Sequence, residues 1–555
     1  MPAVYATKKT REVAGLVDKM IERVEGGAAR GEIFDSVKNE SGFSAPEAMQ
    51  PLLGRLHDDD SSRIFDAVAD GIKIYKAEHG TYPTADVVEA AIQQGHSAII
   101  FRGEGVALDS ATSMRHDPGS MQPNRAVVAV LSGIAEAIPF ASYLPVDIGS
   151  NEAKLIIASH IAGSTYGDYA SGGIMDGIDL GGSYTSALRF VKFDTSGAQP
   201  WNSKFTQVNL AADAGYCDPA GTGLPVLRGR TIVSINGIPV TSDSLQSVGA
   251  NSSFSGSIKL PGQSATLTIT GYVTVANGAI QITSLTGGSL PAGAVIMAEA
   301  VIDYETSPSL IPMVQISAQA YSLFANASRV KTAVGIDALG QFQNEMGLDP
   351  RSEALMAVRN QQGAERHYMA LRMAFELARN NVVPYNFDYA AQSPQKIRAQ
   401  IWQDGQSILG EADQKMANTT MDHGITHLYV PEFVKAQLEG LGSDLFVPSG
   451  VPSRAGVYRI GRLYGKYEVY YTPPKGGVSQ SADRKSAKVL AIGRSNNVAR
   501  CPIVLGDAVS STFLDLNMND DLKAQQALYS RDFTKVNPHQ PSAMGCALID
   551  ITNLA

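Results

Sequence analysis

The sequence predicts an α+β protein organised around one very long helix, and three features carry that prediction. Residues 350–381 form an unbroken helical pattern. Residues 311–332, just before it, alternate apolar and polar side chains, as half-buried strands do. Residues 220–300 hold very few charges and consist of short β patterns separated by turn residues, which is typical of a small all-β module.

The first part of the chain, residues 1–115, is predicted to be a helical N-terminal region, because its apolar residues recur at helical spacing. The acidic residues 58–60 precede a helical run and are interpreted as its cap rather than as a metal site, since no second acidic cluster accompanies them. A further helix is expected over 84–93 and a short strand over 98–101. An apolar arm follows in residues 116–160.

Residues 163–183 are rich in glycine and are expected to be low in regular structure, so that a partner surface is needed to hold them. Strands are expected after this stretch, at 185–193 and 204–210. The module at 220–300 is expected to be inserted into a larger domain, and the pairs Asn236-Gly237 and Asn277-Gly278 predict two hairpin turns within it.

The long helix begins favourably, because Asp349 can cap it and Pro350 suits the first helical position. A helix over 350–381 would be about 48 Å long. Its apolar residues define two opposite faces, both predicted to be packed: Leu355, Val358, Met369, Met373 and Leu377 on one, and Ala357, Ala364, Tyr368, Leu371 and Phe375 on the other. A wet polar stripe is expected between them, made of Gln361, Glu365, Arg372, Glu376 and Arg379.

The remaining chain alternates helices and strands. Ser393-Pro394 is interpreted as the start of a helix over 394–417, and a second helix is expected over 432–441. Strands are predicted at 427–430, 456–459, 466–471, 488–493, 513–516, 529–536 and 546–551.

The composition narrows the class of protein. A chain of 555 residues is too long for one core and suggests three or four domains. Only 18% of residues are charged and 53 are glycine, which favours extensive contact surfaces. The net charge of −9 argues against a sequence-independent nucleic-acid binder. Three scattered cysteines, no visible signal peptide and no run of about 18 apolar residues favour a soluble protein made in the cytoplasm.

The search for catalytic chemistry finds one candidate cluster, formed by Asp422, His423 and His427. The two histidines are four residues apart, which suits a metal ion on a helix, but Gly424 and a strand pattern interrupt any helix there. Asp422, His423, Asn418 and the threonines between them are interpreted instead as a helix end and a solvated loop.

Other motifs fail. Gly172, Gly173, Gly177, Gly181 and Gly182 lack the lysine-serine pair and the strand-to-helix turn of a phosphate loop. Cys217 and Cys501 are expected to be buried small hydrophobic residues, and no Gly-x-Ser-x-Gly elbow occurs. The sequence therefore predicts no catalytic, cofactor-binding or metal-binding residues.

The elements follow one another in an order that also occurs in a known family. The stretches that carry the likeness are residues 310–319, 328–332, 335–347, 349–381, 424–434, 461–471, 488–493 and 541–551. Over residues 122–555 this order resembles the tailed-bacteriophage major capsid proteins that share the Hong Kong 97-type fold.

The resemblance implies that fold, with a spine helix, peripheral and axial domains, an N-arm and an extended loop (E-loop), here combined with a helical N-terminal region and an inserted small all-β domain. The implied division is: helical region 1–115, N-arm 116–160, E-loop 161–219, β module 220–300, peripheral domain 301–392 with the spine helix at 350–381, axial domain 393–535, and closing peripheral strand 536–555.

The resemblance also implies a function. The expected role is a structural major capsid protein, not an enzyme, that assembles into hexamers and pentamers of an icosahedral head around double-stranded DNA without reading its sequence. Its expected partners are itself and decoration, portal and scaffolding proteins, with no membrane. It would be assembled in the bacterial host cytoplasm and end in the virion capsid. Many relatives lose an N-terminal scaffolding region to a protease, and whether this chain does so stays open.

Two alternatives remain at this point. A phage tail sheath or tube protein could carry similar inserted β modules, although sheaths usually end in strand-donating termini. A soluble metal-dependent enzyme using His423 and His427 is the other. Particle shape distinguishes a capsid protein from a tail sheath or tube protein, and the metal content of the purified protein would identify the enzyme.

Overall fold

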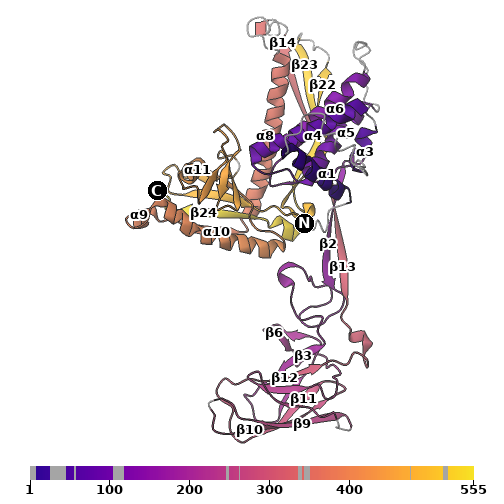
Figure 1. Ribbon diagram of the computed structural model, residues 1–555, viewed down its shortest axis with the longest axis vertical. Helices are drawn as coiled ribbons and strands as arrows, with labels where there is room; N and C mark the ends of the chain where they lie inside the picture. The colour runs from indigo at the N-terminus through magenta and orange to yellow at the C-terminus, as the bar shows by residue number, and fades with distance from the viewer. Residues whose placement is uncertain are drawn as a thin grey trace. The chain divides into compact units, whose positions relative to one another are not determined.

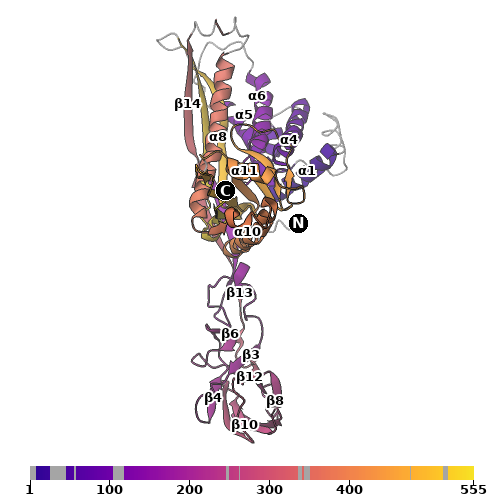
Figure 2. The same cartoon turned by 90° about the vertical axis from the view of Figure 1, so that its left-hand side faces the viewer.

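The computed structural model describes residues 8–25, 46–54, 58–103, 118–245, 249–261, 263–335, 341–342, 350–475, 477–516 and 523–555. They form two compact units (Figures 1 and 2). The first unit holds the residues up to Ile157 and from Gln319 onward, and the second unit holds residues 158–318. The chain therefore leaves the first unit, builds the second, and returns.

The helices of the first unit are α1 (Lys8–Glu25), α3 (Gln50–Leu53), α4 (Asp58–His79), α5 (Ala85–Gly103), α6 (Pro118–Ala135), α8 (Pro350–Ala378), α9 (Tyr389–Gln392), α10 (Arg398–Thr420), α11 (Glu432–Glu439) and α12 (Gln540–Ala543), with a 3₁₀ turn η3 (Val498–Arg500). Its strands are β1 (Ser142–Tyr143), β14 (Asn326–Gly335), β15 (Val382–Asn386), β16 (His427–Val430), β17 (Phe446–Pro448), β18 (Tyr458–Leu463), β19 (Tyr467–Tyr471), β20 (Ser479–Gln480), β21 (Ala487–Ile492), β22 (Ile503–Leu516), β23 (Lys523–Val536) and β24 (Cys546–Thr552).

The long helix is confirmed as α8, which lies beside the strands β14, β22 and β23 (Figure 1). Its fully buried residues, Ala370, Leu371, Ala374 and Ala378, lie toward its C-terminal end, whereas Met369 is 42% exposed. The prediction of two packed faces is confirmed only in part. Met373 and Leu377 of one face and Tyr368 and Phe375 of the other pack against the main core, while Ala357 and Ala364 are exposed. The predicted polar stripe is confirmed, since all five of its residues are exposed.

A large sheet separates two cores of the first unit. Its strands run in the order β15-β24-β21-β16-β19-β18-β17, with β20 paired to β21. Side chains alternate along the central strands: Leu490 of β21 and Leu548 of β24 join the core with α8 and the N-terminal helices. Val489 and Ile549, one residue further along, join the core with α10. The period of two thus lets one sheet carry helices on both faces.

A second sheet has the order β1-β22-β23-β14. Its two longest strands, β22 and β23, are paired antiparallel, with irregular register after Asp507. This sheet accounts for the predicted strands at 513–516 and 529–536, which are the end portions of longer strands.

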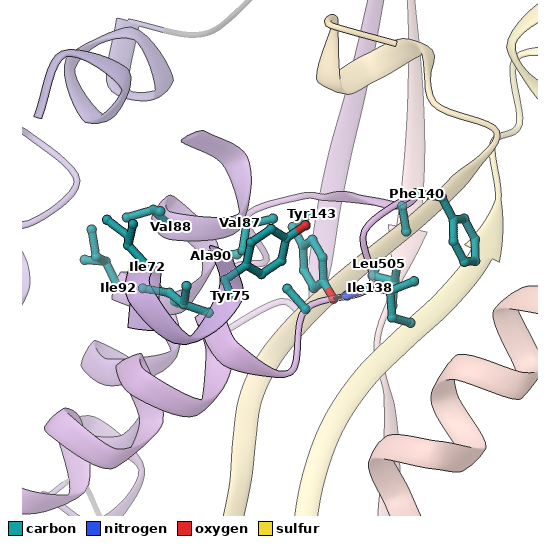
Figure 3. Packing of buried hydrophobic residues seen from close by; sticks show 14 of the residues in the cluster. Ile72, Tyr75, Val87, Val88, Ala90, Ile92, Ile138, Phe140, Tyr143 and Leu505 are labelled. Atoms are coloured by element: carbon teal, nitrogen blue, oxygen red, sulfur yellow. Dashed lines mark hydrogen bonds between the residues drawn. The ribbon is translucent and has the colours of Figure 1, made fainter. Parts of the chain in front are cut away.

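The N-terminal helices are built into the main core. Side chains from α4 and α5, including Tyr75, Val88 and Ile92, pack with Phe140 and Leu505 in one cluster (Figure 3). The predicted helix at 84–93 is confirmed but runs on as α5 to Gly103, so the expected strand at 98–101 is wrong. The acidic residues 58–60 are the first residues of α4 and not a cap before it. At residues 98–101 the local preference for a strand is overridden, because α5 packs against α6.

Differences also occur at α10. The helix starts at Arg398 after the extended residue Ile397, and Ser393 instead ends the short helix α9. The predicted role of Ser393 as the N-cap of this helix is therefore wrong. The strand at 427–430 and the helix after it are confirmed as β16 and α11.

The second unit consists of β strands around one core. Its strands are β3 (Leu188–Lys192), β4 (Trp201–Lys204), β5 (Asn209–Leu210), β6 (Asp213–Cys217), β7 (Ile232–Ile235), β8 (Ile238–Ser242), β9 (Asn251–Ile258), β10 (Leu267–Thr274), β11 (Ala279–Thr286) and β12 (Ile296–Val301), with 3₁₀ turns η1 (Gly177–Asp179) and η2 (Pro308–Leu310). They form sheets β4-β11-β10-β9 and β5-β6-β3-β12-β7-β8.

Both predicted hairpin turns are confirmed. Asn236 and Gly237, between β7 and β8, have φ of 49° and 76°, the positive values that a type I′ turn requires. Gly278, between β10 and β11, has φ of 64°.

The predicted division between an E-loop at 161–219 and a β module at 220–300 does not match these sheets. The strand β3 pairs with β12, and β4 pairs with β11, so both stretches build one unit. Residue 219 is therefore not a boundary. The fall in the number of charged residues that suggested it does not determine which strands pair.

The division of the first unit also differs from the one implied. The strands β22 and β23, placed in the axial domain at 393–535, pair with β1 and β14 instead. The closing strand β24, expected to complete the peripheral domain, pairs with β15 of that range and also with β21 of the range expected for the axial domain. The α+β class and the long helix are confirmed, while these finer assignments change.

Two strands, β2 (Glu152–Ala162) and β13 (Val314–Phe324), form a separate two-stranded sheet, called the ribbon below. The chain passes out of the first unit along β2 and back along β13. The expected strand at 311–332 is confirmed as β13 and β14, which are interrupted only at Ala325.

Candidate assembly surfaces

The histidine pair singled out in the sequence is not brought together as a metal site. His427 lies in β16, where its Nδ1 is 2.7 Å from Thr426 Oγ1 and its ring contacts Tyr470. His423 lies in the loop after α10, and its ring fills the space beside Gly493 and Gly545. Within the described ranges, no group of three or more His, Cys, Asp or Glu residues is arranged to hold a metal ion.

The interpretation of residues 422–423 as a helix end is confirmed. The backbone N–H of His423 donates to Thr420 Oγ1, which in turn donates to His423 O at 2.8 Å, and both bonds close the last turn of α10. The side chain of His423 is only 8% exposed, however, so it is not a solvated loop residue as expected. Asp422 accepts a hydrogen bond from the Ser495 hydroxyl, which lowers the pKa of its carboxyl together with the neighbouring His423.

The cysteines are buried and unpaired, as predicted for Cys217 and Cys501. Burial raises the pKa of the Cys501 thiol to about 11, and the Cys217 thiol donates to Thr206 O. A thiol held protonated in this way is a poor nucleophile. The thiol of Cys501 therefore does not indicate catalysis.

The glycine-rich stretch at 163–183 is low in regular structure, as expected, but its ends are tied down inside the second unit. Tyr184 Oη donates to Met313 O at 2.7 Å, and its ring meets those of Tyr166 and Tyr169 edge-on. The sequence-based prediction for this stretch considered its glycines and did not include contacts made by these tyrosines. Aromatic residues spaced through a glycine-rich stretch are the signal that could have found the contacts.

A polar cavity of about 520 Å³ lies in the first unit between α5, α6, α8 and the strands β22 and β23. Each of its acidic groups already has a partner. Asp507 pairs with Arg366 at 2.8 Å, Glu136 pairs with Arg359 at 3.1 Å, and Asp532 accepts from Ser530 at 3.0 Å. Burial raises the pKa of the Glu136 and Asp532 carboxyls. Arginines therefore hold two of these three carboxylates, and the third accepts a hydrogen bond from a serine hydroxyl.

The ribbon exposes apolar side chains to solvent. Ile156 of β2 is 59% exposed, and Val314 and Ile316 of β13 are 52% and 72% exposed. One side of the ribbon is covered within the chain, because Leu155 and Ile157 are buried in a cluster with Phe533. Exposed apolar groups on its other side indicate a surface that another protein covers. The ribbon is therefore the first candidate assembly surface.

Exposed apolar residues of α8 form the second. Met356, Ala357 and Ala364 are exposed toward its N-terminal end, and Met369 is exposed further along. Of these, Ala357, Ala364 and Met369 are predicted by the sequence to be packed, because they belong to its apolar faces. The same apolar pattern therefore indicates contact with a partner that the single chain lacks.

No helix among the described residues is long and apolar enough to cross a lipid bilayer.

Comparisons with known proteins give similarities of structure. No family model and no curated protein sequence matches the chain. The capsid structure of the jumbo bacteriophage PhiKZ is similar with a TM-score of 0.36 and 10% identity, covering 74% of this chain and 91% of that one. A chain from Microbacterium phage Oxtober96 gives a TM-score of 0.29 and 14% identity, covering 56% and 92%. The SrpI encapsulin of Synechococcus elongatus gives 0.29 and 11%, covering 44% and 79%. The chain is thus similar, at low sequence identity, to phage capsid and encapsulin structures.

Proposed function

We propose that this chain is the major capsid protein of a tailed bacteriophage, a structural subunit that forms hexamers and pentamers of an icosahedral head around double-stranded DNA. The observation that carries the proposal is the ribbon. It is long, has paired strands with exposed apolar side chains, and leads to a separate β unit. The exposed apolar side chains of this element have no packing partner among the described residues, whereas a subunit that tiles with copies of itself can bury them.

The remaining architecture supports the same role. The helix α8 is anchored by its buried residues and leaves Met356 and Met369 exposed, so each copy offers a second contact surface. In a closed assembly each contact is repeated many times, so each one can be weak. The net charge of −9 disfavours tight, sequence-independent binding of the shell to packaged DNA.

The proposed partners are further copies of the chain, together with decoration, portal and scaffolding proteins. Assembly would take place in the cytoplasm of the bacterial host, and the mature location would be the virion. The subunit needs no cofactor for this role, and its contact with DNA would not read base sequence.

A single charge on the ribbon tests the proposal. Ile316→Asp places a carboxylate at a position that is 72% exposed, so the folded chain should keep its melting temperature within a few degrees. If neighbouring copies cover the ribbon, the variant should fail to assemble, since burying an unpaired carboxylate is costly. Light scattering and negative-stain microscopy of purified protein measure assembly directly.

The control is Gln406→Asp, which adds the same charge on the exposed side of α10. Wild type and this control should both form closed shells, while Ile316→Asp stays a folded monomer or small capsomer. Rods from the wild-type protein would favour a tail tube or sheath. Normal shells from Ile316→Asp would remove the ribbon as the basis of the proposal.

A further inference from the structure

Three of the nine histidines, from distant parts of the chain, meet around two tyrosines in the first unit. His79 ends α4, and its Nδ1 is 3.1 Å from Tyr470 Oη. His367 of α8 has its Nε2 3.4 Å from Tyr429 Oη. The ring of His427, in β16, lies 5.9 Å from that of Tyr470. The two tyrosine rings stack on one another at 5.2 Å. These five residues are called the histidine cluster below.

The cluster joins three elements that belong to different layers of the unit. His79 comes from the N-terminal helices and His367 comes from the long helix. His427 and both tyrosines come from the large sheet. Tyr75 extends it along α4, with its ring 4.4 Å from that of His79, and Phe140 contacts Tyr429 and His367. The end of α4 is therefore held against the sheet and α8 through aromatic and imidazole rings.

The surroundings disfavour protonated imidazole. Burial lowers the pKa of His79 to about 4, and the guanidinium groups of Arg454 and Arg459 lower it further. Burial, followed by the charge of His79, lowers the pKa of His367 to about 3. His427 is shifted to about 3 by burial, by Arg494 and by His79. A charge on His79 thus makes the other two histidines harder to protonate.

The nearby carboxylates are already paired with arginines. Glu78, beside His79, binds Arg454 with two contacts of 3.3 Å. Glu468, near Tyr470, accepts from Arg459 at 2.6 Å and from Arg462 at 2.7 Å.

On the side of Tyr75 and His427, Asp86 binds Arg494 at 3.0 and 3.1 Å. Tyr143 also lies on this side, near Tyr75. Burial raises the pKa of Tyr75, Tyr429 and Tyr470, so these hydroxyls stay neutral and supply no negative charge. A proton that enters the cluster therefore finds no carboxylate that is free of an arginine.

We infer that the histidine cluster is an acid-sensitive lock: it fastens the end of α4 to the long helix and the large sheet at neutral pH, and protonation of its histidines releases α4. His79 and His367 are only partly buried, so solvent protons can reach the cluster. The inference does not depend on the proposed function, because the lock lies within one chain.

The direction of the effect follows from linkage. A released or unfolded histidine has its ordinary pKa near 6.5, above the values in the closed lock. The open state therefore binds more protons as the pH falls below about 6.5. The closed lock is fully favoured above that pH, and its advantage shrinks by up to about tenfold per pH unit for each histidine until the folded pKa is reached near 4 or 3.

Hydrogen–deuterium exchange of the whole chain tests the lock. Exchange of the α4 amides, corrected for the intrinsic dependence on pH, should rise steeply between pH 6.5 and 4.5, while the α10 amides stay protected. His79→Phe keeps a ring beside Tyr75 and removes the titrating group, so the rise should become shallower. The matched control His160→Phe removes a half-exposed histidine of the second unit and should behave as wild type.

A second measurement covers the case in which His79→Phe fails to fold. Exchange of the imidazole C2 hydrogen in the wild-type protein reports the pKa of each histidine separately. Values below about 5 for the three cluster histidines, with opening of α4, support the lock. Values near 6.5, constant α4 protection down to pH 4.5, or simultaneous loss of protection in α4 and α10 would each overturn it.

Discussion

At the scale of single residues, one buried ion pair attaches the N-terminal helices to the sheet. Arg494 donates to both carboxylate oxygens of Asp86, at the start of α5, and to Pro139 O at 2.6 Å. The side chains are 10% and 2% exposed. Asp86 also accepts from the backbone N–H of Tyr143. Removing the arginine would leave this carboxylate buried without its counter-ion.

We expect Arg494→Met to destabilise the first unit by about 3–5 kcal/mol, the usual cost of breaking a buried pair. The matched control is Arg454→Met. Its partner Glu78 and Arg454 are 38% and 48% exposed, so this change should cost less than about 1 kcal/mol. Urea unfolding followed by tryptophan fluorescence and circular dichroism compares the two. Equal midpoints for both variants would show that the buried pair contributes no more than a surface one.

The residue scale is also where sequence reasoning failed most clearly. It joined His423 with His427 because they are close in the chain, whereas the structure places His427 with His79 and Tyr470. Asp86 and Arg494 are 408 positions apart, and His79 and Tyr470 are 391 apart. Such pairs leave no local pattern, because only tertiary folding brings them together.

At the scale of elements, the long helix shows what periodicity can and cannot predict. The helix and its polar stripe follow from local rules, namely a first-position proline and regular spacing, while the predicted cap Asp349 lies outside the described residues. Which apolar residues are covered does not follow from these rules, because this depends on what the rest of the chain presents. Leu371 is fully buried, and Met369, two residues earlier, is 42% exposed.

A pair of substitutions tests the packing of the long helix. Leu371→Asp buries a carboxylate in the main core and should lower the free energy of unfolding by about 4 kcal/mol or more, with little soluble protein recovered. Met369→Asp should fold with near wild-type stability, because its side chain already meets water. The yield of soluble protein and the melting temperature decide the matter. Comparable damage from both substitutions would mean that both positions are packed within one chain.

At the scale of the whole molecule, the sequence predicted the α+β class, the long helix and a charge-poor β region, but not the units. Charge and turn patterns suggested that a module begins at residue 220, whereas strands from 188 onward pair with strands beyond it. The last strand, β24, inserts between β15 and β21. Strand order is a long-range property, so hydrophobic alternation identifies strands without assigning their neighbours.

Among the described residues, the ribbon and α8 both expose large apolar side chains. Closed association of identical copies, as proposed above, would cover them.

A cryo-electron microscopy reconstruction of the particles formed by the purified wild-type chain tests this account most directly. We predict a closed shell with fivefold and sixfold clusters of the chain, in which the ribbon of each copy lies under protein from another copy. A helical tube, a particle that remains a single chain at every concentration, or a closed shell in which β2 and β13 stay bare to solvent would contradict it.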